Sequence, residues 1–151
     1  MAEPIIEARD VVKVYETGEL TVRALQGVNI TIEAGEMVAV MGPSGCGKTT
    51  LLNTFSGIDT ITSGDVRVAN RALNEMSDRE RTRYRSQNMG FVFQSFNLLP
   101  VLSGVENVEL PLLLAGVQQQ EARARALALM ELVGIVEQAN KRPAEMSGGQ
   151  Q

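Results

Sequence analysis

Short apolar stretches separated by turn residues dominate the chain before residue 95, which indicates β-strands. In residues 25–32 apolar side chains alternate with polar ones, as in a strand with one buried face. Residues 37–41 are apolar throughout, which is typical of a strand buried on both faces. The predicted strands are residues 5–15, 25–32, 37–41, 66–68 and 91–93.

Helix-start signals and helical spacing predict the helices. Two capping boxes, in which glutamate follows serine by three residues, begin at Ser77 and Ser103. Glu121 and Arg125 have the i,i+4 spacing that supports a helix. The predicted helices are residues 48–55, one beginning near Ser77, one beginning near Ser103, and residues 121–133. Strands therefore come first and a helical block follows, with a boundary near residue 95.

One motif carries specific chemistry, because its residues match the phosphate-binding pattern G-x-x-x-x-G-K-[ST]. Its glycines let backbone amides converge on an anion, and the following helix adds unpaired N–H groups and its dipole. Lys48 supplies a positive charge for terminal phosphates, and Thr49 supplies a hydroxyl for Mg²⁺. An ordinary glycine turn before a helix is the disfavoured alternative, since the motif joins an apolar strand to a helix. The motif is Gly42, Pro43, Ser44, Gly45, Cys46, Gly47, Lys48 and Thr49.

Cys46 lies inside this loop, where two interpretations differ. A helix N-terminus lowers a thiol pKa, which is compatible with a redox-sensitive cysteine. The favoured interpretation is a small residue whose backbone amide matters and whose side chain does not.

Composition excludes several classes of protein. With 14 Lys and Arg against 18 Asp and Glu, the net charge is -4, which argues against a nucleic-acid partner. A single cysteine excludes an intramolecular disulfide framework, and the lack of histidine excludes His-based catalysis and His metal ligands in this chain. The sequence shows no secretory signal and no apolar stretch long enough to span a bilayer.

Two further segments, together with the phosphate-binding loop, identify a family resemblance. Ser147, Gly148, Gly149 and Gln150 follow the loop by about a hundred residues, and Gln94 follows residues 91–93 between them. In this combination the chain resembles the nucleotide-binding subunit of an ABC transporter over residues 5–151. Within that family, residues 41–45, 90–100 and 106–111 are most similar to the lipoprotein-release and macrolide-export type.

The resemblance implies a fold and a domain organisation. The expected fold class is α/β, a three-layer P-loop NTPase core with an antiparallel β subdomain, joined to an α-helical subdomain. Residues 1–151 are expected to form an incomplete ABC ATP-binding domain. Residues 1–94 would be the nucleotide-binding core and β subdomain, and residues 95–151 the helical subdomain up to the signature motif.

The resemblance also implies roles for individual residues. Residues 42–49 and Thr50 would bind the phosphates of ATP, with Lys48 and Gln94 catalytic and Thr49 and Gln94 at the Mg²⁺. Ser147, Gly148, Gly149 and Gln150 would close on ATP held by a second copy in a head-to-tail homodimer. Tyr15 would stack on adenine, and residues 98–100 would lie near a transmembrane permease partner. The resemblance implies a cytoplasmic protein that lies peripherally on the inner face of the membrane through this partner.

Three of these roles have plain structural alternatives, and for residues 98–100 the alternative is a buried loop. For Tyr15 the alternative is a half-buried tyrosine on a strand. Without the family pattern, the residue type supports this alternative about as well as it supports adenine stacking. Gln94 has the position of a polar residue that ends a strand. For Tyr15 and Gln94 the family pattern favours the functional role.

Groups that the family uses for hydrolysis are not found in this sequence. No Asp is followed by Glu, and there is no histidine. The capping-box pattern of Ser147 and Gln150 indicates a helix start, yet only Gln151 follows. We therefore expect a truncated ATPase domain, which binds ATP but hydrolyses it poorly by itself.

The leading function is an ATP-binding subunit that powers a membrane transporter, for lipoprotein release or macrolide or peptide export. Alternatives are a regulatory or scaffold subunit of a membrane complex, of the cell-division type, and a non-functional remnant. A DNA-repair or chromosome-organising ATPase is disfavoured, because no sustained heptads lie between loop and signature.

Overall fold

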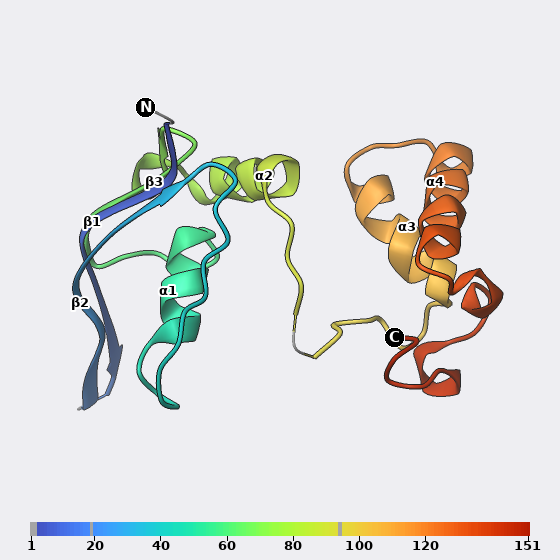
Figure 1. Cartoon of the computed structure of the whole chain (residues 1–151), viewed down its shortest axis with the longest axis horizontal. Coiled ribbons are helices and arrows are strands. Elements are labelled where there is room, and N and C mark those ends of the chain that lie inside the picture. The colour runs from blue at the N-terminus through green and yellow to red at the C-terminus, as the bar shows by residue number, and fades with distance from the viewer. Residues whose placement is uncertain (1–2, 19, 94) are drawn as a thin grey trace. The chain divides into compact units, whose positions relative to one another are not determined.

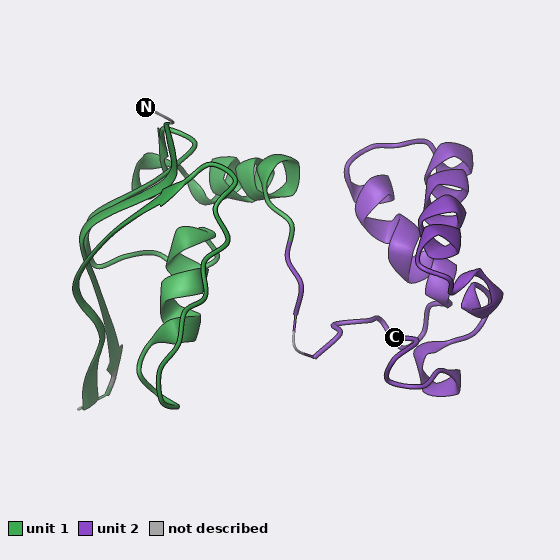
Figure 2. Ribbon diagram, in the orientation of Figure 1, with its two compact units in different colours: residues 1–90 green, residues 91–151 purple. Residues whose placement is uncertain are grey.

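The computed structural model describes residues 3–18, 20–93 and 95–151. The chain divides into two compact units, residues 1–90 and 91–151, whereas the predicted boundary lies between residues 94 and 95 (Figure 2). Each unit is described by itself. No helix in the described ranges is long and apolar enough to cross a membrane.

The first unit contains a four-stranded antiparallel sheet with the order β2-β1-β3-β4 (Figure 1). A long hairpin forms its main part, and in it Lys13 pairs with Leu25 and Tyr15 with Val22. The strands are β1 (Pro4–Thr17), β2 (Leu20–Glu33), β3 (Ser63–Val68) and β4 (Arg71–Ala72). The strands predicted at residues 5–15, 25–32 and 66–68 are confirmed, and each is longer than the pattern indicated.

Helix α1 (Lys48–Phe55) has the predicted bounds, and it packs two of its apolar residues on this sheet. Leu51 and Phe55 of α1 join strand residues such as Val11 and Val66 in one buried cluster. Burial of these side chains supplies the main stabilisation of the unit, about 25 cal/mol for each Å² of apolar surface removed from water. The core thus fixes the helix that begins at Lys48.

Helix α2 (Asp78–Asn88) begins at the predicted capping box and follows the short 3₁₀ helix η1 (Leu73–Glu75). The Glu80 carboxylate accepts from the Ser77 N–H at 2.9 Å, and the Ser77 hydroxyl accepts from the Glu80 N–H at 3.4 Å. Tyr84 of this helix donates to the Val68 carbonyl at 2.8 Å. These contacts attach α2 to the end of β3.

Two predicted strands are wrong for this structure. Residues 37–41 and 91–93 form no strand in the described part of the chain, and Met37 is 98 % exposed. A strand requires a neighbouring backbone for its hydrogen bonds, and no described segment pairs with either stretch. Phe91 and Phe93 instead stack on each other, with ring centroids 6.0 Å apart. The α/β class therefore appears here as an antiparallel sheet with helices, without a parallel layer among the described residues.

The second unit is helical, as predicted. It contains α3 (Gly104–Leu114), α4 (Gln119–Leu132) and the 3₁₀ helices η2 (Val136–Gln138) and η3 (Pro143–Glu145). Glu106 accepts from both the N–H and the hydroxyl of Ser103, so the predicted box opens α3. A small core lies between α3, α4 and the segment after them, made of Val105, Ala126, Met130 and Ala139.

Candidate functional site

The glycine-rich loop, residues 42–47, leads directly into α1. Gly47 is the N-cap and has a left-handed backbone with φ of 94°. A Cβ atom at Gly47 would lie 2.5 Å from the carbonyl oxygen of Ala24 on β2. Glycine is therefore required here both by conformation and by the close approach of the hairpin.

The Lys48 ammonium holds the loop in a curled form. Its Nζ donates to the carbonyl oxygens of Gly42 at 2.9 Å and Pro43 at 2.7 Å. The Cys46 Sγ lies 3.7 Å from the same Nζ. An ammonium has three donors and sulfur is a weak acceptor, so one N–H is available for a stronger acceptor such as a phosphate oxygen.

The first turn of α1 presents further donors. No side chain caps this helix. The N–H groups of Lys48, Thr49 and Thr50 precede the first helical hydrogen bond, from Leu51 to Gly47 O at 2.8 Å. Thr49 is exposed on this turn. The donors and the helix dipole together favour an anion.

A hollow of about 350 Å³ lies beside the loop, within the size range of small-ligand sites. Lys48 is the one charged residue in its lining, which consists of Ala24, Leu25, Gln26, Val28, Val40, Met41, Cys46, Gly47, Lys48 and Leu51. The loop and β2 therefore leave space for a ligand next to the Lys48 ammonium.

The remaining loop residues, Pro43, Ser44, Gly45 and Cys46, are exposed. Gly45 has a left-handed backbone with φ of 79°, which a loop of converging amides requires. The Cys46 Sγ would lie 2.7 Å from a Cβ at Gly42, so the thiol occupies the space beside that glycine. Its role as a small loop residue or as a redox-sensitive thiol stays a prediction.

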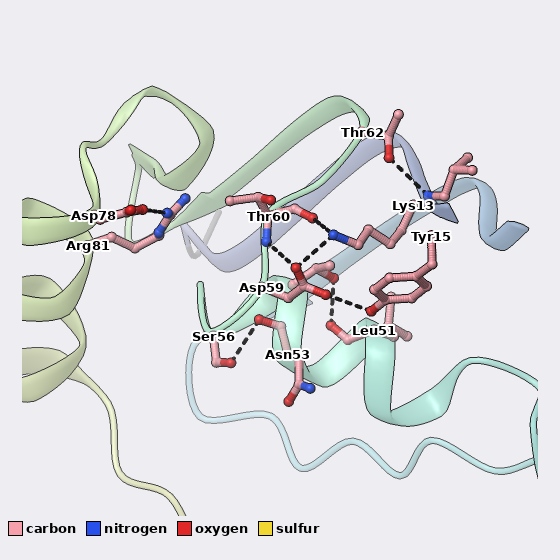
Figure 3. Close-up of polar contacts among 12 residues, drawn as sticks. Lys13, Tyr15, Leu51, Asn53, Ser56, Asp59, Thr60, Thr62, Asp78 and Arg81 are labelled. Atoms are coloured by element: carbon pink, nitrogen blue, oxygen red, sulfur yellow. Dashed lines mark hydrogen bonds and ion pairs between the residues drawn. The ribbon is translucent and has the colours of Figure 1, made fainter. Parts of the chain in front are cut away.

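Tyr15 lies on β1 within a polar network that reaches the segment after α1 (Figure 3). Its hydroxyl donates to Asp59 Oδ2 at 2.6 Å, and the side chain of Tyr15 is exposed at 37 %. The Lys13 Nζ lies 4.7 Å from the centroid of the Tyr15 ring and 2.7 Å from Asp59 Oδ1. Lys13 also donates to the Thr60 carbonyl at 2.7 Å.

These partners change the acidity of Asp59. Partial burial of the carboxylate raises its pKa, but hydrogen bonds from Lys13, Tyr15 and the Thr60 N–H outweigh this and hold the pKa below its usual value. Asp59 is therefore a carboxylate that these three donors keep ionised.

Sequence reasoning missed Lys13 and Asp59. One signal for Lys13 was available, since a lysine between Val12 and Val14 on a predicted strand requires a partner if it is buried. Lys13 is indeed buried in the structure. Asp59 carries no comparable signal, because only the fold brings the segment after α1 next to β1.

The predicted signature residues lie in the second unit. The Ser147 N–H donates to the Gln150 side-chain oxygen at 2.9 Å, and the Gln150 N–H donates to the Ser147 carbonyl at 2.9 Å. Gly148 and Gly149 are exposed, and a Cβ added at either would meet no atom within 4 Å. Neither glycine has a positive φ, so the chain's own packing does not require glycine at these positions.

The structure thus brings the loop and Tyr15 into the first unit and leaves Ser147 to Gln150 in the second. Gln94, predicted as a catalytic and metal-binding residue, lies outside the described residues. In the described ranges no group of three or more Cys, Asp or Glu side chains could hold a metal ion by itself.

Comparison with known proteins establishes the family. The chain belongs to the ABC transporter family, whose profile matches residues 25–151. It is 42 % identical over 150 residues to the lipoprotein-releasing system ATP-binding protein LolD of Saccharophagus degradans, which covers 99 % of this chain and 66 % of LolD. It is 44 % identical over 151 residues to the macrolide export ATP-binding/permease protein MacB of Rhodopseudomonas palustris, covering 100 % of this chain and 23 % of MacB.

A solved structure shows the same architecture. A dimeric post-hydrolysis state of the ATP-binding cassette MJ0796, bound to ADP and Pi, superposes with a TM-score of 0.87 at 42 % identity. The match covers 96 % of this chain and 64 % of that one. MJ0796 comes from Methanocaldococcus jannaschii. The chain spans slightly less than two thirds of the length of the curated relatives that it matches first, for example 63 % of an uncharacterized ABC transporter ATP-binding protein of Thermotoga maritima. The predicted family and fold class are therefore confirmed.

Proposed function

We propose that this chain binds MgATP and belongs to a subunit that hydrolyses ATP to power a membrane transporter. The observation that carries the proposal is the loop around Lys48, in which an ammonium and uncapped helix amides converge beside a hollow. Phosphate is the anion that such a loop suits best. The family supports adenosine as the nucleoside.

The residues of the first unit take distinct parts in binding. The N–H groups of Gly45 and of the residues from Gly47 to Thr50 would contact the phosphates, and Lys48 would neutralise their terminal charge. The Thr49 hydroxyl would be a ligand of Mg²⁺, a cation that prefers oxygen ligands. Mg²⁺ supplies the charge that stabilises phosphoryl transfer when it is bound. Tyr15 stacks on adenine, and Gln94 contacts the metal or its water.

The signature residues act on the nucleotide of a second copy. Gly148 and Gly149 expose their backbone, and neither the backbone conformation nor the described neighbours require glycine there, which fits close approach by a ligand held elsewhere. The MJ0796 cassette is dimeric in its solved structures. In a two-fold dimer of this chain, Ser147 to Gln150 of one copy would complete the loop site of the other.

Coupling to a membrane partner is the last part of the proposal. MacB is named as an ATP-binding and permease protein, and LolD as part of a lipoprotein-releasing system. By analogy, a permease subunit or domain would hold this chain at the inner face of a membrane, and lipoprotein or macrolide export is the proposed type of transport.

Calorimetric titration with MgATP tests the proposal. The wild-type chain should bind MgATP, and Lys48→Ala should lower the affinity by about tenfold or more, since it removes a charged phosphate contact. Arg125→Ala is the matched control, because it removes an exposed cation of the second unit without touching the loop. Equal affinity for MgATP in Lys48→Ala and wild type would refute phosphate binding by this loop.

Turnover distinguishes a transport ATPase from a regulatory subunit. A version of the protein extended to the length of its relatives should hydrolyse ATP faster when its permease is present in vesicles. Binding without any turnover in those vesicles would favour the regulatory alternative.

A further inference from the structure

Asp59 is the centre of the polar network that contains Tyr15. Its two carboxylate oxygens have separate partners, Lys13 Nζ on Oδ1 at 2.7 Å and the Tyr15 hydroxyl on Oδ2 at 2.6 Å (Figure 3). The Thr60 N–H also donates to Oδ1, at 2.7 Å. All of these partners lie on β1 or directly beside Asp59 itself, so the carboxylate is a fixed bridge between a strand and a loop.

The loop with Asp59 is attached to α1. The Asp59 N–H donates to the Asn53 carbonyl of α1 at 3.1 Å, and the Gly57 N–H donates to Thr54 O at 3.2 Å. Helix α1 is eight residues long, which corresponds to about 12 Å. Its first residue is Lys48, so the phosphate loop lies at the start of this helix. Asp59, which holds the Tyr15 hydroxyl, lies just beyond its end.

The hairpin connects Tyr15 to the phosphate loop through β2. Tyr15 pairs with Val22 on β2, and two residues further along β2 the Ala24 carbonyl lies against Gly47 of the loop. Tyr15 is therefore connected to the phosphate loop by two routes, through β2 and through Asp59 and α1.

Lys13 determines which face of the Tyr15 ring is free. Its ammonium lies over one face, 4.7 Å from the ring centroid, and its own side chain is only 10 % exposed. A planar base that stacks on Tyr15 would therefore use the face opposite the Lys13 ammonium.

We propose that Asp59 is a positioning residue for nucleotide binding, which holds the Tyr15 ring and Lys13 so that one defined ring face is open to the base. The proposal rests on the proposed function. It adds a specific role for Asp59 and Lys13, which do not touch the phosphates. Without Asp59 the Tyr15 side chain can rotate, and the base loses a preorganised stacking partner.

Titration with MgATP and with inorganic tripolyphosphate separates this role from general stability. Stacking of a base on an aromatic ring accounts for roughly tenfold in affinity. Asp59→Ala should lose about that factor for MgATP and less than twofold for tripolyphosphate. Asp65→Ala is the matched control, because Asp65 pairs with Arg67 and is not part of the network; both of its affinities should stay at the wild-type level.

A second pair of variants tests whether Asp59 acts through Tyr15. Tyr15→Phe keeps the ring and removes only the hydroxyl, so it should lose part of the ATP affinity even if Asp59→Ala fails to fold. In a Tyr15→Ala background, Asp59→Ala should cause no further loss of ATP affinity.

The outcomes separate the two proposals. Equal losses for ATP and tripolyphosphate in Asp59→Ala, or unchanged ATP affinity in Tyr15→Phe, would overturn the positioning role and leave the phosphate site intact. A wild-type chain that binds neither ligand would overturn the proposed function itself.

Discussion

Arg123 on α4 pairs with Glu109 on α3 through a carboxylate that is only 5 % exposed. Its Nη2 donates to Oε1 at 2.9 Å, and its Nε lies 2.7 Å from Oε2 without hydrogen-bond geometry. The pair crosses between α3 and α4 beside the small apolar core of the second unit. Glu109 therefore depends on Arg123 for compensation of a buried charge.

Arg123→Ala should lower the free energy of unfolding of the second unit by about 2–3 kcal/mol, below the range for a fully buried pair because Arg123 is partly exposed. Chemical denaturation followed by helical circular dichroism measures this. Arg125→Ala is the control, since its pair with Glu121 is exposed and should contribute less than about 0.5 kcal/mol. Losses of equal size in the two variants would contradict the argument.

Gly47→Ala should destabilise the first unit by about 1–3 kcal/mol, the usual cost of a strained backbone conformation. The substitution places a Cβ 2.5 Å from the Ala24 carbonyl and forces φ of 94° on alanine. Thermal unfolding of Gly47→Ala and of Gly148→Ala makes the comparison, because an added Cβ at Gly148 meets open space. If Gly148→Ala lowered the melting temperature as much as Gly47→Ala does, the close contact and the left-handed backbone at Gly47 would not explain the loss.

Gly149→Ala should leave the melting temperature unchanged and weaken ATP-dependent self-association. The reason is that a Cβ added at Gly149 would meet no atom of the described residues within 4 Å, whereas a nucleotide held by a second copy would approach its backbone. Analytical ultracentrifugation with and without MgATP is the measurement. Association at the wild-type level would argue against the composite site.

Asp59 should make stability depend on acid pH. Its pKa in the folded chain is lowered from 3.8, so its contribution is fully present above that value and is lost as pH falls through the lower folded pKa. Urea unfolding at pH 7 and near pH 3 should therefore show a smaller difference for Asp59→Asn than for wild type. If the two proteins lost equal stability on acidification, the hydrogen bonds from Lys13 and Tyr15 would not stabilise the carboxylate.

Local patterns predicted most of the elements that the structure contains. The helix over residues 48–55 and the starts at Ser77 and Ser103 are found as predicted, because capping and side-chain periodicity act between residues close in the chain. The hairpin strands were also predicted, because apolar and polar side chains alternate along a strand that has one buried face. The phosphate-binding loop was predicted for the same reason, since its glycines and lysine lie close together in the sequence, between Gly42 and Lys48.

Contacts between distant segments could not be predicted in this way. The sequence pattern of residues 37–41 and 91–93 favours strands, but a strand forms only where a second backbone lies alongside, and none does in the described chain. Asp59 is an ordinary polar residue in the sequence. It becomes the partner of Lys13 and Tyr15 only because burial of Leu51 and Phe55 docks α1 on the sheet.

The sequence alone thus determined the family and the positions of the main helices, because each depends on residue types at short, regular spacings. For the same reason it predicted a phosphate-binding loop. The tertiary structure decided which carboxylate compensates the buried Lys13, that the Lys13 ammonium covers one face of the Tyr15 ring, and why Gly47 must be glycine. These features depend on side chains and carbonyl groups that meet across the sheet, and the hydrophobic core sets their distances.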